Sequence, residues 1–129
     1  MTEKIQGFLG DAATEKGGCT PTAFKSDGSA KAGVIKASPG QLYGASFDNT
    51  NASPAYCRLY NQTTSPATSD TPVYRFKIPG STTVGGREKV WPKGLEFSIG
   101  IAYRITTGIA DSDDTAAASN EVFANFDKC

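Results

Sequence analysis

Residues 95–106, LEFSIGIAYRIT, decide the fold class of this chain. Large side chains fall on every second position, and small or polar residues occupy the positions between; the large ones are Leu95, Phe97, Ile99, Ile101, Tyr103 and Ile105. Side chains of a β-strand point alternately to its two faces, so the pattern predicts one long, half-buried strand with a single apolar face. On a helix the same side chains would be scattered around the circumference.

The neighbouring sequence supplies further strands, which a lone strand needs for stability. The same alternation predicts strands at 42–48, 55–61, 73–78 and 121–127, separated by stretches rich in Asn, Pro and Gly. The Gly-rich, charged stretch 81–90 reads as a loop that leads through Trp91 into the long strand. Short strands punctuated by turn residues are typical of antiparallel sandwiches. We therefore predict an all-β chain in which residues 39–129 form an antiparallel β-sandwich of jelly-roll or Ig-like type.

Residues 1–38 have little periodic hydrophobicity and many small or polar residues. Two interpretations are open: an extended arm that docks on a neighbouring surface, or a lead-in that ends in one short strand at 32–37. We treat this segment as an extended N-terminal arm.

The charge balance and the hydropathy of the chain exclude some classes of protein. Lys plus Arg and Asp plus Glu number 13 each. A balanced charge argues against a protein that binds nucleic acid directly by neutralising phosphates. The chain has no apolar run of membrane-spanning length and no secretory signal at its start, so we expect synthesis in a cytoplasm and no membrane partner.

The sequence offers no recognisable catalytic constellation. It contains no histidine, which is the commonest general base and metal ligand. Glu96 and Glu121 are better explained as outward residues of half-exposed strands than as a catalytic pair. The run 111–114, DSDD, resembles part of a calcium loop but lacks its glycine and distal glutamate, which favours a solvated acidic loop. We predict that the protein is not an enzyme and holds no cofactor or metal.

Five tyrosines and three cysteines are the other candidate site residues. The tyrosines at 43, 56, 60, 74 and 103 could form a sugar-binding platform, but their alternation along strands favours the core. Zinc normally needs four Cys or His ligands, so a zinc site is not expected. Cys57 shares a strand face with Leu59, which favours burial as a small apolar residue over the alternative of a disulfide cross-link. Cys129 ends the chain, and its exposed thiol is either free or linked to another subunit.

A family resemblance extends from residue 39 to residue 126. The segments SPGQLYGASFDNTNASPAYCRLYNQ, TPVYRFKIPG, PKGLEFSIGIAYRITTGIADSDDTAA and EVFANFD, in this order, resemble small structural proteins of tailed-bacteriophage virions. The most specific part is 94–111, where a glycine, a strand with a central glycine, Ile-Thr-Thr-Gly and Ala-Asp follow one another. The resemblance leaves residues 1–38 unmatched and does not explain the three cysteines.

The resemblance implies a non-enzymatic β-sandwich that decorates or cements a phage capsid in the virion. Its implied partners are the major capsid protein and neighbouring copies, as a dimer or trimer. A released particle meets an oxidising medium, so we expect Cys19 and Cys129 to form disulfides between subunits. The alternatives are a neck, tail or fibre-base protein of the same particle, and a module that binds a surface glycan or protein.

Overall fold

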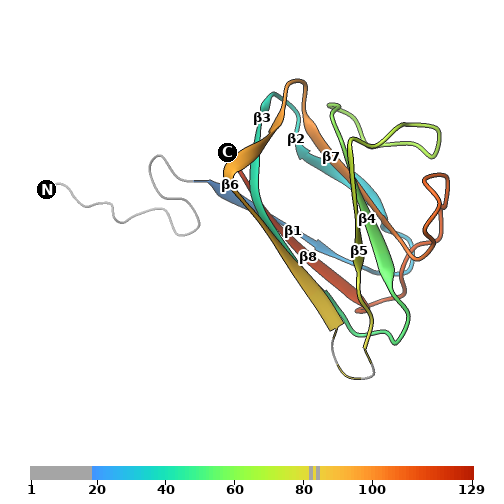
Figure 1. The fold of residues 1–129 in the computed structure, drawn as a ribbon. Helices are drawn as coiled ribbons and strands as arrows, with labels where there is room; N and C mark the ends of the chain where they lie inside the picture. The colour runs from blue at the N-terminus through green and yellow to red at the C-terminus, as the bar shows by residue number, and fades with distance from the viewer. Residues whose placement is uncertain (1–18, 82, 84) are drawn as a thin grey trace, which may run out of the picture.

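The computed structural model describes residues 19–81, 83 and 85–129, and these residues form strands and loops without a helix. Figure 1 shows the strands arranged in two layers. In chain order, the strands are β1 (Thr20–Lys25), β2 (Ala32–Lys36), β3 (Gly40–Asn49), β4 (Ala55–Tyr60), β5 (Tyr74–Ile78), β6 (Gly85–Phe97), β7 (Ile101–Thr106) and β8 (Val122–Lys128).

The strands form two four-stranded sheets. Sheet A has the order β1-β8-β3-β6 and sheet B the order β2-β7-β4-β5, and all pairings are antiparallel. The first strand pairs with the last, the second with the seventh, the third with the sixth and the fourth with the fifth. This nested order is that of a jelly roll and differs from the immunoglobulin arrangement. The predicted all-β, antiparallel sandwich is confirmed.

The core lies between the sheets and is built from alternate residues of facing strands. On β8, Val122, Ala124 and Phe126 are buried, as their alternation predicts. Phe47 of β3 contacts Phe76 of β5 and Phe126 with ring centroids 5.0 and 5.7 Å apart. The contact between Phe47 and Phe76 joins the two sheets, and the contact between Phe47 and Phe126 links neighbouring strands within sheet A.

The prediction of one continuous strand over residues 95–106 is wrong. β6 ends at Phe97, β7 begins at Ile101, and the two strands belong to different sheets. Asn61 holds the turn between them, because its Oδ1 accepts hydrogen bonds from the backbone N–H of Ile99 at 2.9 Å and of Gly100 at 3.3 Å. The alternation continues across the turn because each strand separately directs alternate side chains into the same core. Ile99, which lies in the turn between the two strands, is 53% exposed and is not part of this buried row.

The predicted N-terminal arm, 1–38, is also wrong over much of its length. β1 pairs with β8 and β2 pairs with β7, so the sandwich includes residues from Thr20 onward and does not begin at residue 39. The short strand predicted at 32–37 is confirmed as β2. Phe24 and Ile35 are the buried apolar residues of these two strands. Few such residues are needed in an edge strand, because a neighbouring strand supplies its backbone hydrogen bonds. Residues 1–18 of the predicted arm lie outside the described residues.

The stretch 85–90, predicted as part of a loop, is the first half of β6. The β3–β6 register shifts between Leu42, which pairs with Leu95, and Gly44, which pairs with Val90. The extra residues on β6 therefore form a bulge. Gly94 lies in this bulge with φ +81°, a backbone conformation that favours glycine.

Candidate functional site

The two end cysteines form a disulfide within the chain. β1 and β8 pair with Thr20 opposite Lys128, and Cys19 and Cys129 are the next residues along that same register. Their sulfur atoms are bonded, with the Cα atoms 4.6 Å apart. Figure 1 shows the C-terminus beside the start of β1. The predicted disulfide between subunits is therefore wrong, because antiparallel pairing brings the two ends of one chain together.

Cys129 was expected to be exposed and mobile, but the sandwich holds it. Its backbone N–H donates to Gln41 O, and Gln41 N donates to Cys129 O, both at 2.9 Å. Lys128 Nζ donates to Thr22 Oγ1 at 2.8 Å on the opposite side. The disulfide thus links the ends of β1 and β8, and the two backbone hydrogen bonds link the end of β8 to β3.

Cys57 is the free cysteine and is fully buried, which confirms the sequence-based expectation. It lies on β4 opposite Phe76 of β5 and Ile105 of β7. Burial raises the pKa of its thiol, so the reactive thiolate is disfavoured. Cys57 functions as core packing.

The outer face of sheet B carries a row of three arginines. Arg58 of β4 pairs in register with Arg75 of β5 on one side and with Arg104 of β7 on the other. Arg58 and Arg104 are buried, whereas the side chain of Arg75 is 55% exposed. Like charges directly across a sheet destabilise it, and a buried charge needs a partner, so this row requires anions beside it.

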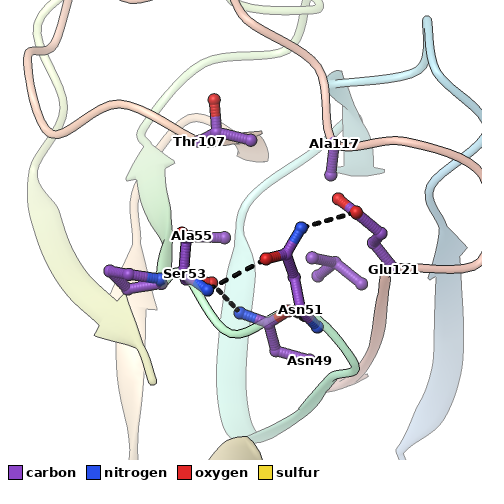
Figure 2. Close-up of a pocket in the computed structure, with 9 residues that line it drawn as sticks. Asn49, Asn51, Ser53, Ala55, Thr107, Ala117 and Glu121 are labelled. Carbon is purple, nitrogen blue, oxygen red and sulfur yellow. Dashed lines mark hydrogen bonds between the residues drawn. The ribbon is translucent and has the colours of Figure 1, made fainter. Parts of the chain in front are cut away.

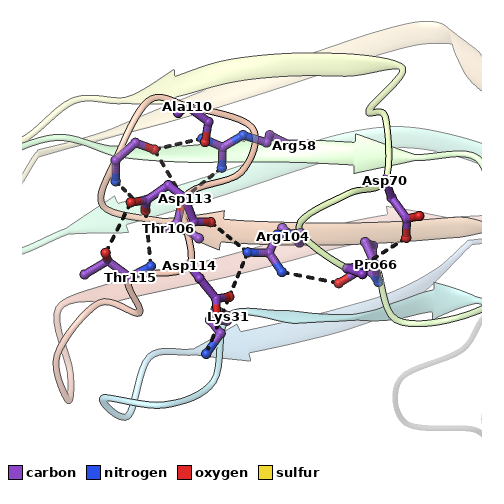
Figure 3. Close-up of polar contacts among 12 residues, drawn as sticks. Lys31, Arg58, Pro66, Asp70, Arg104, Thr106, Ala110, Asp113, Asp114 and Thr115 are labelled. Carbon is purple, nitrogen blue, oxygen red and sulfur yellow. Dashed lines mark hydrogen bonds and ion pairs between the residues drawn. The ribbon is translucent and has the colours of Figure 1, made fainter.

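The loop after β7 supplies partners for Arg58 (Figure 3). Nε of Arg58 donates to Asp111 Oδ1 at 3.2 Å, and Nη1 donates to Thr106 Oγ1 at 2.8 Å. Nη2 donates to the backbone carbonyls of Gly108 at 2.8 Å and Ala110 at 2.7 Å. Arg75 binds the same Asp111 carboxylate through Nε and Nη2, the latter at 2.6 Å. One aspartate is therefore shared by two neighbouring arginines.

Two loops cover Arg104. Its Nη2 donates to the Asp113 carbonyl at 2.7 Å and to Asp114 Oδ1 at 2.9 Å, and Nη1 donates to the Pro66 carbonyl at 3.3 Å. Lys31 Nζ lies 3.7 Å from Asp114 Oδ1 and completes the cluster in Figure 3. Loops 61–73 and 107–116 thus cover the outer face of sheet B, which explains why every residue of β7 is buried.

The acidic run 111–114 has a more specific role than a solvated loop. The hydrogen bond from Arg75 holds the pKa of Asp111 below its usual value, and the hydrogen bond from Arg104 does the same for Asp114. Asp113 Oδ2 accepts from the backbone N–H of Gly108 at 3.0 Å and of Thr115 at 3.2 Å and shapes the loop itself. Sequence reasoning missed this network, although three outward-facing arginines on neighbouring strands and one Asp-rich loop were its visible signal.

Among the described residues, two buried side-chain atoms have no hydrogen-bond partner: Tyr60 Oη and Arg104 Nε. Tyr103 is 9% exposed and belongs to the core between the sheets, which confirms the core interpretation for this tyrosine. Tyr60 is fully buried on the other face of β4, the face that carries Arg58, beneath the loops that cover sheet B. Tyr74 packs against the core from its edge, and Tyr43 and Tyr56 are half-buried on their strands. The tyrosines are thus spread through the fold and line no common surface.

A polar hollow of about 170 Å³ lies at the end of the sandwich where β3 turns into β4 (Figure 2). Asn49 is buried, and its Nδ2 donates to the Ser53 carbonyl at 3.0 Å. Asn51 Nδ2 donates to Glu121 Oε2 at 2.5 Å. Glu121, expected to face outward, is half-buried here. Because these groups hold the 49–54 turn against the start of β8, they are structural supports.

No group of three or more potential metal-ligating Cys, Asp or Glu side chains occurs within residues 19–81, 83 and 85–129. The same part of the chain contains no helix that could span a membrane.

Comparison of the chain with known family models, with curated proteins and with solved structures finds no match.

Proposed function

We propose that this protein is a non-enzymatic structural component of a tailed-bacteriophage virion that decorates the capsid and stabilises it. Its partners in this proposal are the major capsid protein and neighbouring copies of itself. The resemblance of residues 94–111 to such proteins supports the proposal, and so does the jelly-roll order, which is frequent in viral capsid domains.

The observation that carries the proposal is the disulfide between Cys19 and Cys129. Disulfides persist in oxidising surroundings and are rare in the cytoplasm. A virion protein is synthesised in a reducing cytoplasm and then functions outside the cell, where such a bond can form. The bond closes a loop that spans nearly the whole described chain, so it resists unfolding without any help from a second subunit.

The use of polar groups inside the molecule also supports a structural role. The buried arginines of sheet B bind loop carbonyls and carboxylates of the same chain, and the hollow at Asn49 is held by its own side chains. These contacts fix loops onto the sheets. A rigid body with one sheet covered by its own loops still offers the outer face of sheet A to a partner.

The test is to locate the protein in purified phage particles. Mass spectrometry of particles banded in a density gradient should detect the chain at a fixed ratio to the major capsid protein. A cryo-electron microscopy map should then show the sandwich at regular positions on the shell. Absence from washed particles would overturn the proposal, whereas density at the neck, tail or fibre base would replace the capsid location with that site.

A second measurement tests stabilisation directly. Particles that lack the protein should release DNA at a lower temperature than complete particles, and addition of the purified, oxidised protein should restore the higher temperature. An unchanged release temperature would show that the protein does not reinforce the shell.

A further inference from the structure

Charge is unevenly distributed along this neutral chain. The stretch 71–95 contains five cations, Arg75, Lys77, Arg87, Lys89 and Lys93, and one acid, Glu88. Because Lys plus Arg equals Asp plus Glu over the whole chain, the remaining residues carry the compensating negative charge. The fold places this cationic stretch on β5 and β6, at neighbouring edges of the two sheets.

Side-chain contacts hold the edges of β5 and β6 together without a backbone ladder. Trp91 packs edge-on against Tyr74 at 5.7 Å, and the Arg87 guanidinium lies 5.8 Å from the centre of the Phe76 ring. Arg87 Nη1 also donates to the Lys77 carbonyl at 3.5 Å. We call the surface along this edge the cationic seam; it comprises Val73, Arg75, Lys77 and Arg87, which are exposed, and Lys89, which is half-buried.

Within the part of the chain that the structure describes, most of the charge on the cationic seam has no counter-charge. Arg75 is paired with Asp111, but no described carboxylate lies within ion-pair distance of Lys77, Arg87 or Lys89. Val73, two residues before Arg75 at the start of the seam, is 58% exposed. Like charges that gather next to an exposed apolar side chain are unfavourable for the isolated chain and are suited to an acidic partner surface.

A surface of opposite charge lies on the outer face of sheet A. Asp127 of β8 and Val90 of β6 flank Gly44 of β3 in register, and Asp127 Oδ2 would lie 3.2 Å from a Cβ at Gly44. Asp48 and Glu88 are exposed on the same face, and Val90 is 61% exposed. We call Asp48, Glu88, Val90 and Asp127 the acidic face.

The acidic face is open because its central residues are small. Ser46 pairs in register with Asn125 on one side and with Glu88 on the other. Lys25 lies at the β1 corner of this face, opposite Phe123. On the outer face of sheet B, loops cover Arg58 of β4 and Arg104 of β7, and the β5 edge with Arg75 and Lys77 stays exposed.

Pairing through the strand edges is disfavoured. β6 carries Pro92, Lys93 and a bulge, and β1 carries Pro21 and Lys25. Charged residues, proline and bulges on edge strands are devices that prevent edge-to-edge pairing. A second molecule is therefore better accommodated on a face or along the seam than as an added strand.

We propose that the cationic seam of one copy docks on the acidic face of a second copy. The two surfaces have opposite charge, and each presents one exposed valine, Val73 on the seam and Val90 on the face. Complementary charge steers such an encounter and fixes its register, while the valines add apolar contact. Because the surfaces differ, the contact is heterologous and leads to a ring if it closes or to a chain if it does not.

This inference rests on the proposed function insofar as an assembly protein must contact its neighbours, but its test uses the isolated protein in solution. Sedimentation velocity of the oxidised wild-type chain at low salt should show concentration-dependent association that weakens as salt is raised. A chain that stays monomeric up to millimolar concentration at low salt would overturn the inference, whatever the particle experiment shows.

Charge reversal identifies the two surfaces. The seam variant is Lys77→Glu with Lys89→Glu, which avoids the ring contact of Arg87, and the face variant is Asp48→Lys with Asp127→Lys. Each variant alone should associate about tenfold or more weakly than wild type, because like charges then meet. An equimolar mixture should recover association, since each variant retains or acquires a surface that complements the other.

The outcomes separate this contact from other acidic partners. Recovery in the mixture supports docking between copies, whereas failure of the mixture to associate overturns it. Lys25→Glu, which adds negative charge to the acidic face, should tighten association, and a weaker association would count against the contact. Urea unfolding of each variant shows that it is folded before its association is compared.

Discussion

Arg58 and Arg104 face each other in register on the neighbouring strands β4 and β7, and their exposed fractions are only 1% and 3%. A pair of buried like charges is unfavourable unless each finds an anion and carbonyl acceptors. Loop 107–116 provides both, since Asp111 and Asp114 approach from the outer side together with the carbonyls of 108, 110 and 113. This loop is therefore part of the folded body.

The first prediction concerns the two arginines that share Asp111. Arg58→Ala should lower the free energy of unfolding by about 3–5 kcal/mol, because it leaves the Thr106 hydroxyl and the Ala110 carbonyl without the donor that Arg58 supplies. Arg75→Ala removes an exposed partner of the same carboxylate and should cost much less. Urea unfolding monitored by tryptophan fluorescence measures both. Equal losses of unfolding free energy in the two variants would show that the burial of Arg58 does not increase its contribution to stability.

The second prediction concerns the hydroxyl groups beneath the loops. Tyr60 Oη has no hydrogen-bond partner, so Tyr60→Phe should leave stability unchanged or raise it by up to about 1 kcal/mol. Thr106 Oγ1 accepts from Arg58 and donates to the Gly108 carbonyl, so Thr106→Val should cost about 1–3 kcal/mol. A large loss for Tyr60→Phe in the same unfolding assay would contradict this assignment.

The third prediction is the response to acid. The pKa of Asp111 is held below its usual 3.8 in the folded chain, chiefly by the hydrogen bond from Arg75. A depressed pKa contributes stability that is complete above the unfolded value and is lost as the pH falls through the folded value. Stability should therefore decline below about pH 4, and Asp111→Asn should show a shallower decline there. Identical acid profiles of wild type and Asp111→Asn would refute the prediction.

The fourth prediction concerns the disulfide. Its loop spans 110 residues in sequence separation, for which the chain-entropy model gives about 4–5 kcal/mol of stabilisation. Reduction of wild type with dithiothreitol should lower the unfolding free energy by about this amount. The double variant Cys19→Ser with Cys129→Ser should start from the lower value and not respond to the reductant. A disulfide-linked dimer on a non-reducing gel would contradict the intrachain bond.

The fifth prediction is a thiol count. Cys57 is buried with a raised pKa, so the native oxidised chain should react with no equivalent of a thiol reagent. Unfolding without reductant should expose one thiol, and unfolding with reductant all three cysteines. Cys57→Ala should abolish the single thiol signal that unfolding without reductant produces in wild type. Fast reaction of the native chain would show that the core opens around β4.

Local patterns in the sequence predicted much of the fold. The alternation at 121–127 gave the inward row of β8, and the position of Cys57 beside Leu59 gave its burial. β1 was missed because Phe24 is its single large apolar residue, and an edge strand held by its neighbour's hydrogen bonds needs little more. The break at 98–100 was missed because alternation is the same on both sides of a turn that changes sheets.

The sequence by itself determined that the chain is all-β, where most of its strands run and which side chains they bury, because a strand's side-chain period is a local property. Only the tertiary structure decided which strands are neighbours. That decision joined Cys19 to Cys129 within one chain, aligned Arg75, Arg58 and Arg104 in a single row, and set Asp111 between two of them. Each of these contacts depends on the register between segments far apart in sequence, which the period of any one segment does not contain.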